Sequence, residues 1–173
     1  QFRQAGEDLA SHGLISTHGG NMSIRHRGRL IITAHFSRLG RLEPGDLVEV
    51  PLREEPDHVT SDASQDVALH QLIYKFTPAG AVIHAHPAYA VALSLRLDVI
   101  TPRDLEGSVL LKEIPVVPAA ALTSEIPQLL QSRLAVMARG HGSYVAGKTL
   151  DEALACTSAL ALSCKITWLA GRS

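Results

Sequence analysis

Short apolar runs of two kinds alternate along this chain of 173 residues, and each kind predicts a different element. Runs rich in β-branched residues predict strands, whereas apolar residues three and four positions apart predict helices. The predicted helices cover residues 1–12, 64–74, 88–96, 128–134 and 150–170. The predicted strands cover 30–33, 47–50, 81–86 and 113–117, with short strands around a double-glycine turn at 15–25 and a hairpin at 136–147. This mixture predicts one α/β domain over residues 1–173, with a central sheet flanked by helices.

Single residues predict where several of these elements begin and end. Gly13 suits the left-handed position after the first helix, and Ser64 is the predicted N-cap of the second. Thr149 and Glu152 form a capping box before the last helix. Pro87 has no N–H to donate, so the strand before it is predicted to end there.

His84 and His86 lie in the predicted strand at 81–86 and are the first indication of chemistry. Side chains two positions apart in a strand point to the same face, about 7 Å apart along the pleat. Both imidazoles can therefore coordinate one divalent metal ion. The same motif is equally compatible with two histidines that bind no metal, one hydrogen-bonded within the fold and one exposed to solvent. The strand alone therefore leaves both interpretations open.

The composition restricts the class of partner. The net charge is −1 and aromatic residues make up only 4% of the chain. A nucleic-acid-binding surface needs a basic footprint, and an anionic membrane attracts basic patches, so neither partner is expected. We expect a small-molecule partner instead.

The apolar segment at 150–170 carries Asp151, Glu152 and Lys165, which favours a packed helix over a membrane span. The first residues are polar and unlike a signal peptide, and the sequence starts without methionine, so we expect it to begin inside the first helix. Cys156 and Cys164 are too far apart along one helix to bond each other. We therefore expect a reduced, cytoplasmic protein.

A third histidine can complete a metal site. His141 stands between Gly140 and Gly142, which permit a tight turn and the close approach of a ligand. Three neutral imidazoles with an open fourth position are the donor set of catalytic zinc. His84, His86 and His141 are therefore the predicted metal ligands.

Residues near the predicted helix at 64–74 suit proton transfer and anion binding. Asp66 in its first turn is the predicted general acid/base, and Ser64 with the free N–H groups of the helix start can hold an anion such as phosphate. The Gly-Gly-Asn sequence at 19–21 offers further donors, although such a sequence is also a common turn. His70, four positions after Asp66, is predicted to be packed or ion-paired rather than a ligand.

Five stretches, in order along the chain, together resemble the class II aldolase/adducin family. They are residues 19–25, 30–33, 67–74, 81–87 and 139–147. The resemblance implies a three-layer α/β/α sandwich around a largely antiparallel sheet. It also implies a homotetramer with sites at the subunit interfaces.

The same resemblance implies roles for the site residues. His84, His86 and His141 would ligate zinc, in a site that can also accept cobalt, manganese or nickel. Asp66 stands at the position of the family's catalytic glutamate. The residues assigned to the phosphate or polar end of the substrate are Asn21, Gly20, Ser64, Gln65 and His35. In such aldolases the metal chelates both oxygens of a hydroxyketone and stabilises the enediolate left by C–C cleavage, while the carboxylate moves the proton.

Several positions depart from the pattern of the family's sugar-phosphate aldolases. Asp66 is one methylene shorter than glutamate, a loss of about 1.5 Å in reach. His35-Phe36 replaces a Thr-Gly pair in the phosphate loop, Gln65 replaces a serine, and His18 replaces a threonine.

A tyrosine that the aldolase takes from a neighbouring subunit aligns near Leu105. The proton donor that this tyrosine provides is therefore not expected here. Asp104 or Glu106 is the hypothetical replacement.

The predicted function is a zinc-dependent aldolase that cleaves a small hydroxycarbonyl or sugar-phosphate substrate through a metal-stabilised enediolate. The alternatives that keep the metal site are 4-epimerisation, dehydration or decarboxylation of a related substrate. An alternative of another class is a non-catalytic, adducin-like assembly module. That module is expected to have lost the metal ligands, whereas all three histidines are present here.

Overall fold

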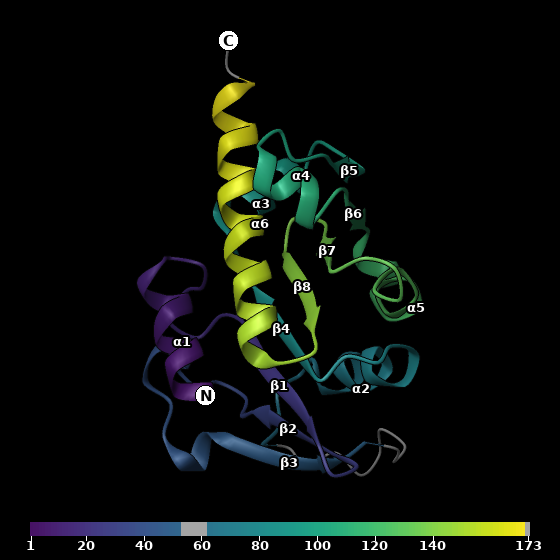
Figure 1. Cartoon of the computed structure of the whole chain (residues 1–173). Coiled ribbons are helices and arrows are strands. Elements are labelled where there is room, and N and C mark those ends of the chain that lie inside the picture. Colours follow the sequence, from purple (N-terminus) through teal and green to yellow (C-terminus); the bar gives the residue numbers. More distant parts are fainter. Residues whose placement is uncertain (53–61, 172–173) are drawn as a thin grey trace.

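An eight-stranded sheet forms the centre of the molecule in the computed structural model, which describes residues 1–52 and 62–171 (Figure 1). Its strands are β1 (Asn21–His26), β2 (Arg29–Thr33), β3 (Leu47–Pro51), β4 (Ala81–Ala85), β5 (Val99–Ile100), β6 (Ile114–Val117), β7 (Ala135–Ala138) and β8 (Gly142–Gly147). The strand order is β3-β2-β1-β4-β8-β7-β6-β5. Of the neighbouring pairs, β6 and β7 are parallel and the others are antiparallel. β4 thus lies in the middle of the sheet.

Helices cover both faces of this sheet. The helices are α1 (Phe2–Ser11), α2 (Val67–Phe76), α3 (Ala88–Ser94), α4 (Leu105–Leu110), α5 (Leu122–Leu129) and α6 (Leu150–Ala170), with short 3-10 helices at Leu39–Arg41, Pro44–Asp46 and Ala119–Ala121. Figure 1 shows α1 and α6 on one side of the strands and α2 and α5 on the other. Along β4, Ala81 and Ile83 pack in the core cluster of α1 and α6, whereas Val82 packs in that of α2. The predicted three-layer α/β/α sandwich with a largely antiparallel sheet is confirmed.

Two predicted element ends are confirmed in atomic detail. Gly13 follows α1 with a φ of +65°, a left-handed conformation that glycine adopts without strain. The Thr149 side chain accepts a hydrogen bond from the Glu152 backbone N–H at 3.1 Å at the start of α6. The Glu152 carboxylate, however, accepts from the Lys148 backbone N–H at 2.7 Å, so the reciprocal half of the box reaches one residue further back.

The predicted N-cap of the second helix, Ser64, is two residues too early. α2 begins at Val67 rather than Ser64, and Asp66 occupies its N-cap position. The segment before α2 is tied to the sheet, because Ala63 forms a bridge with Ala34 and the Ser64 N–H donates to Thr33. Pairing with the sheet therefore overrides the capping preference of Ser64, whose hydroxyl accepts from the Asp66 N–H at 3.3 Å.

The prediction for the segment between β5 and β7 is also wrong in detail. The helix expected at 128–134 is α5, which lies earlier and contains Pro127. Proline normally opens a helix rather than standing inside one, but burial of its neighbour Ile126 stabilises α5 here. The short helix α4 was not predicted, and the Asp104 side chain caps it by accepting from the Gly107 N–H at 2.8 Å. Most of the polar loop predicted at 51–63 lies outside the described residues.

α6 is long and apolar enough to cross a membrane, judged by length and composition alone. In this fold it packs against β4, β8 and α3. Residues spaced three and four apart along it are buried, among them Ala153, Cys156, Leu160 and Cys164. Packing within the core thus accounts for its apolar side, and both cysteines are buried free thiols.

Candidate metal centre

A row of three side chains crosses the middle of the sheet. Asn21 on β1 pairs with His84 on β4, and His84 pairs in turn with Tyr144 on β8. Directly paired residues of antiparallel strands lie on the same face of the sheet, and α2 covers this face. His86 lies just beyond β4 on the same side, as its 2.9 Å Nε2–Nε2 separation from His84 shows. The predicted common face of the two histidines is therefore confirmed.

The imidazole rings of His84, His86 and His141 converge. His84 Nε2 lies 2.9 Å from His86 Nε2 and 3.0 Å from His141 Nε2. The potential ligand atoms of all three lie within 4.8 Å of one another. His84 is buried, His86 half-buried and His141 exposed, so the group extends from the core to the surface.

The donor chemistry of this group fits a divalent metal ion. His84 Nδ1 lies 2.9 Å from the carbonyl oxygen of Ser143. Because a carbonyl only accepts, Nδ1 carries the hydrogen and Nε2 presents its lone pair to the other histidines. A tetrahedral zinc site separates its nitrogen ligands by about 3.3 Å, slightly more than the separations seen here. Burial lowers the pKa of His84 to about 3 and also lowers that of His86, which keeps both rings in the neutral form that metals require.

Gly142 is required by the close approach of β8 to His84 on β4 and to His86 just beyond it. A Cβ atom at this position would lie 2.4 Å from the Ala85 carbonyl oxygen, 2.5 Å from His86 Cδ2 and 2.8 Å from His84 Cε1. Gly140, on the other side of His141, adopts a φ of +67° in the tight turn. Gly140 therefore permits the tight turn, whereas Gly142 leaves room for the two imidazole rings.

We predict that Gly142→Ala weakens metal binding by about 10- to 100-fold, the range typical when the support of a ligand is disturbed. The added methyl group meets backbone as well as both rings, so the rings must move. Zinc titration against a competing chelator measures the change. Gly45→Ala is the matched control, because a Cβ there meets nothing within 4 Å. An affinity equal to that of the control would contradict the prediction.

Asp66 directs its carboxylate towards His84, with Oδ2 3.8 Å from His84 Nε2. The same oxygen accepts hydrogen bonds from Asn21 Nδ2 at 2.8 Å and from the Tyr144 hydroxyl at 3.0 Å. Burial acts to raise the pKa of Asp66, but the hydrogen bonds from Asn21 and Tyr144 favour the carboxylate, and the pKa lies below its usual value. Asp66 is therefore ionised at neutral pH.

His70 belongs to a buried network beside the site and is not a ligand, in agreement with its predicted packed role. Its Nδ1 lies 2.6 Å from Ser23 Oγ, which in turn lies 2.8 Å from the Tyr74 hydroxyl. Burial lowers the pKa of His70 to about 4, although Asp66 acts in the opposite direction. The ring is therefore neutral in the folded protein at neutral pH.

The depressed pKa of His70 predicts a loss of stability in acid. Below its ordinary pKa of 6.5 the unfolded chain takes up a proton that the folded protein takes up only near pH 4. The destabilisation from this residue should therefore begin as the pH falls through 6.5 and reach about 3 kcal/mol near pH 4. Urea unfolding of the metal-free protein between pH 7 and pH 4 measures this loss. His70→Gln should be less stable at pH 7 but lose less stability on acidification, and parallel pH curves would contradict the prediction.

The predicted site residues line one cleft of about 310 Å³. Its lining includes Gly20, Asn21, His35, Ser64, Gln65, Asp66, His84, His86 and His141, together with His18 and Phe36. The structure thus brings every predicted site residue to one place. The Asn21 amide nitrogen gives one of its two hydrogen bonds to Asp66, which leaves its second N–H for a substrate, whereas its Oδ1 is buried and has no hydrogen-bond partner among the described residues. Contacts between these residues and a substrate stay predictions.

Phe36 stands in a strained conformation at the mouth of this cleft. Its φ is +59°, in the left-handed region that costs a side-chain-bearing residue about 1–2 kcal/mol. Its ring is 72% exposed and lies 4.0 Å, centroid to centroid, from the ring of His35. His18 Nδ1 donates to the Phe36 carbonyl at 2.8 Å, which helps to hold the turn. Phe36, which stands where the family's aldolases have glycine, thus keeps a backbone conformation typical of glycine and points its ring outward.

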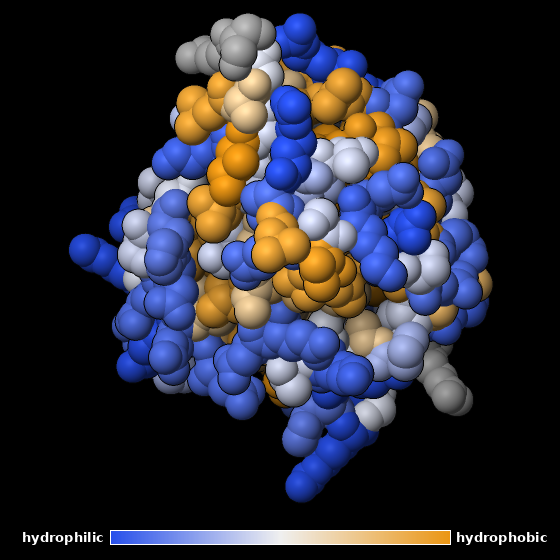
Figure 2. Space-filling view, turned by 45° about the horizontal axis from the view of Figure 1, so that its top comes forward, coloured by the Kyte–Doolittle hydropathy of each residue, from blue (hydrophilic) through white to orange (hydrophobic). Residues whose placement is uncertain are grey.

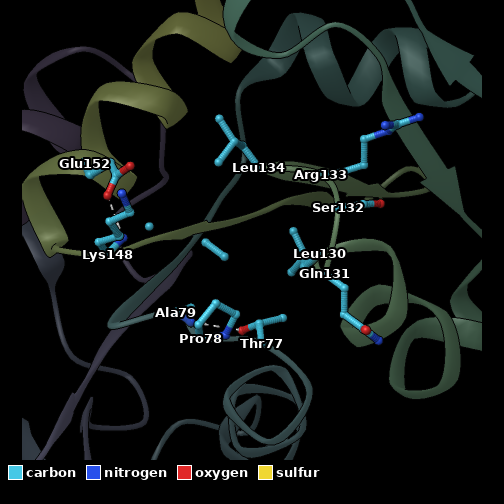
Figure 3. Close-up of a pocket in the computed structure, with 12 residues that line it drawn as sticks. Thr77, Pro78, Ala79, Leu130, Gln131, Ser132, Arg133, Leu134, Lys148 and Glu152 are labelled. Carbon is cyan, nitrogen blue, oxygen red and sulfur yellow. Dashed lines mark hydrogen bonds between the residues drawn. The ribbon is translucent and has the colours of Figure 1, made fainter.

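A second cavity, of about 280 Å³, lies at the other end of β4 and β8 (Figure 3). Thr77, Pro78, Ala79, Leu130 and Leu134 give it an apolar wall, and Lys148 and Glu152 lie at its edge. The described residues that line it include no histidine, and the Glu152 carboxylate is engaged by the Lys148 backbone. It lacks the donor set of the first cleft.

Tyr144 is the functional candidate that the sequence did not reveal. It was predicted only as part of a hairpin, yet its hydroxyl contacts Asp66 and its ring stacks on His84 with centroids 4.2 Å apart. The available signal was the spacing of Tyr144, which comes two positions after Gly142 in the same strand. Side chains two positions apart lie on one face of a sheet, here the face that carries His84.

Comparison with known proteins agrees with this geometry. The sequence profile of the family described as Class II Aldolase and Adducin N-terminal domain matches residues 1–168. That range contains every residue of the cleft.

Individual relatives carry two kinds of name. The methylthioribulose-1-phosphate dehydratase of Gluconobacter oxydans (strain 621H) is 33% identical, over 98% of this chain and 91% of that protein. The L-fuculose phosphate aldolase of Methanocaldococcus jannaschii is 26% identical, over 98% of this chain and 94% of that protein. The crystal structure of L-fuculose-1-phosphate aldolase from Thermus thermophilus has a TM-score of 0.92 and 37% identity, covering 97% of this chain and 91% of that one. The chain is thus similar over nearly its whole length to proteins named as a dehydratase and as aldolases.

Proposed function

Because the chain belongs to the class II aldolase and adducin family, we propose that it is a metal-dependent lyase acting on a ketose 1-phosphate. The observation that supports this most directly is the position of Asp66, whose Oδ2 lies 3.8 Å from His84 Nε2. A carboxylate and a metal-type donor set in one cleft can act on the same substrate. We propose C–C bond cleavage as the first candidate reaction and loss of water as the second.

His84, His86 and His141 would hold the ion, for which we propose zinc. When bound, such an ion supplies a Lewis acid that polarises the carbonyl group of a substrate. The described residues contribute three donors to the group, which leaves a coordination position for substrate. The presence of all three histidines argues against a non-catalytic assembly module.

Asp66 would transfer the proton. Cleavage of a ketose 1-phosphate returns a proton to the carbon next to the carbonyl, whereas dehydration removes one from that carbon. An ionised carboxylate at the edge of the metal ligands can accept or return this proton. Asp66 is one methylene shorter than the family's glutamate, but its 3.8 Å separation from His84 supports a role beside the proposed ligands.

The phosphate would be held by neutral donors and imidazoles. The described lining of the cleft includes no lysine or arginine. The side chains of Ser64, Gln65 and Asn21, the imidazoles of His18 and His35 and the first N–H groups of α2 are the available donors. The positive end of the helix dipole favours an anion at this place.

Dehydration is the second candidate because a relative 33% identical to this chain is named as a methylthioribulose-1-phosphate dehydratase. The substrates in the names of both kinds of relative are ketose 1-phosphates. The same ligands and the same carboxylate serve either reaction, so the products decide between them.

Incubation of the zinc-loaded protein with L-fuculose 1-phosphate and, separately, with methylthioribulose 1-phosphate tests the proposal. Cleavage of the first should release dihydroxyacetone phosphate, and dehydration of the second should give a product lighter by one water. Asp66→Asn is the matched control, because it retains the three histidines. Turnover of neither ketose 1-phosphate would contradict the proposal, and equal turnover of unphosphorylated L-fuculose would contradict its phosphate part.

We also propose self-association into a homotetramer. Apolar side chains are exposed in the segment after α3 and on β5, α4 and α6, namely Leu95, Leu97, Val99, Leu105, Val109, Leu110, Leu162 and Leu169. Figure 2 turns this end of the molecule towards the viewer and shows hydrophobic groups gathered on it. Extended apolar patches of this kind typically bind another protein surface.

We predict that Leu105→Glu lowers the oligomeric state, because Leu105 is 82% exposed on α4 and would bury a charge in the interface. Sedimentation velocity of the wild type and the variant measures the change. Phe76→Glu is the matched control, since Phe76 is an exposed apolar residue of α2, away from this patch. A wild-type protein that sediments as a monomer would contradict the proposal.

A further inference from the structure

We infer that Tyr144 is a positioning residue that fixes the carboxylate of Asp66 for proton transfer. The inference deepens the proposed function, and its catalytic part rests on that function. Tyr144 donates to Asp66 Oδ2 at 3.0 Å and is only 1% exposed. It is not among the residues that line the cleft, so it acts on a substrate only through Asp66.

Two donors hold the same carboxylate oxygen from opposite sides. Asn21 reaches Oδ2 from β1, and Tyr144 reaches it from β8. Because both strands pair with β4 at His84, the carboxylate is held over that ligand. Among the described residues no donor contacts Asp66 Oδ1, so Oδ1 is the oxygen left to exchange a proton with a substrate.

The Tyr144 hydroxyl stays protonated, so it donates its hydrogen bond to the Asp66 carboxylate and does not accept one from it. Burial raises its pKa above the usual value, and the negative charge and hydrogen bond of Asp66 raise it further. The ring is held by stacking on His84, with centroids 4.2 Å apart and planes inclined by 15°. The direction of the O–H donor is therefore set by the packing of the ring.

A second donor matters because the last torsion of an aspartate side chain is soft. Rotation about this bond exchanges the two carboxylate oxygens with little energetic resistance. With Asn21 as the only donor, the carboxylate could tilt about one hydrogen bond. The additional bond from Tyr144 selects Oδ2 as the anchored oxygen and Oδ1 as the free one.

Tyr144→Phe tests the inference, because it removes the hydroxyl and keeps the stacked ring. Tyr74→Phe is the matched control, since Tyr74 is also buried and its hydroxyl bonds Ser23, without a contact to Asp66. In the metal-free protein, the ¹³C resonance of the Asp66 carboxyl should shift in Tyr144→Phe and stay in place in Tyr74→Phe. The metal content of Tyr144→Phe should equal that of the wild type.

Kinetics give the second readout. Tyr144→Phe should lower kcat by about 10- to 100-fold, the size of effect expected from a misplaced catalytic group, with little change in KM. In the Asp66→Asn background the same substitution should change kcat by less than about twofold, because the two residues act as one unit.

An Asp66 resonance that stays in place in Tyr144→Phe, or that moves equally in the control, would overturn the inference. Equal losses of kcat with and without the Asp66 carboxylate would also overturn it. If the wild type turns over neither ketose 1-phosphate, the proposed function fails, whereas the resonance still decides whether Tyr144 holds Asp66.

Discussion

Replacing His84 by alanine is expected to abolish tight metal binding and to lower kcat/KM by at least about 100- to 1000-fold. A Lewis acid contributes several kcal/mol to such a reaction, and each 1.36 kcal/mol corresponds to a factor of ten in rate. His84 is the central histidine of the group, because its Nε2 lies within 3.0 Å of the Nε2 atoms of both His86 and His141. Its removal leaves two imidazoles, one of them exposed.

Metal analysis after dialysis and steady-state kinetics measure the effect of His84→Ala. Zinc should raise the melting temperature of the wild type, since a ligand that binds only the folded state stabilises it, and should leave that of the variant unchanged. His26→Ala is the matched control, an exposed histidine at the end of β1 outside the cleft. One equivalent of zinc retained by His84→Ala would contradict the assignment of the ligands.

Asp66→Asn is expected to lower kcat by about 100- to 10,000-fold, the range typical of a general acid/base. Asparagine keeps the shape of the side chain, and its carbonyl oxygen can still accept from Asn21 and Tyr144. It has no basic oxygen with which to take up a proton. Metal content should stay near that of the wild type, because the three histidines are untouched.

Activity and zinc content of the same preparation distinguish the two substitutions, since His84→Ala loses both and Asp66→Asn loses only activity. Asp151→Asn, which removes an exposed carboxylate in the first turn of α6, serves as the control for a lost charge. Wild-type kcat in Asp66→Asn would rule out the proposed role of this carboxylate.

The three histidines of the candidate metal centre could be singled out from the sequence because the signals that indicate them are local. The period of two along a strand places His84 and His86 on one face, whatever the rest of the chain does. Gly140 and Gly142 mark the turn that carries His141, and the structure finds both a left-handed φ and a close approach there. Each of these signals comes from the stereochemistry of residues next to one another in the chain.

The errors in the predicted fold arose where distant residues compete with local preference. Ser64 is a good N-cap, but the hydrogen bond of its N–H to Thr33 keeps it at the sheet and delays α2 to Val67. The helix expected at 128–134 lies earlier, at Leu122–Leu129, and contains Pro127, because the buried Ile126 packs this segment into the core. Propensity is a weak preference that packing of this kind overrides.

The sequence by itself determined the types of donor, the shared face of His84 and His86 and the presence of a carboxylate at the start of α2. Only the tertiary structure decided that this carboxylate lies beside His84, and that Asn21 and Tyr144 hold one of its oxygens. The contacts of Asp66 with Asn21 and Tyr144 span 45 and 78 positions of the chain. They depend on the register of β1, β4 and β8 and on the packing of α2 over them, which residues far apart in the sequence set together.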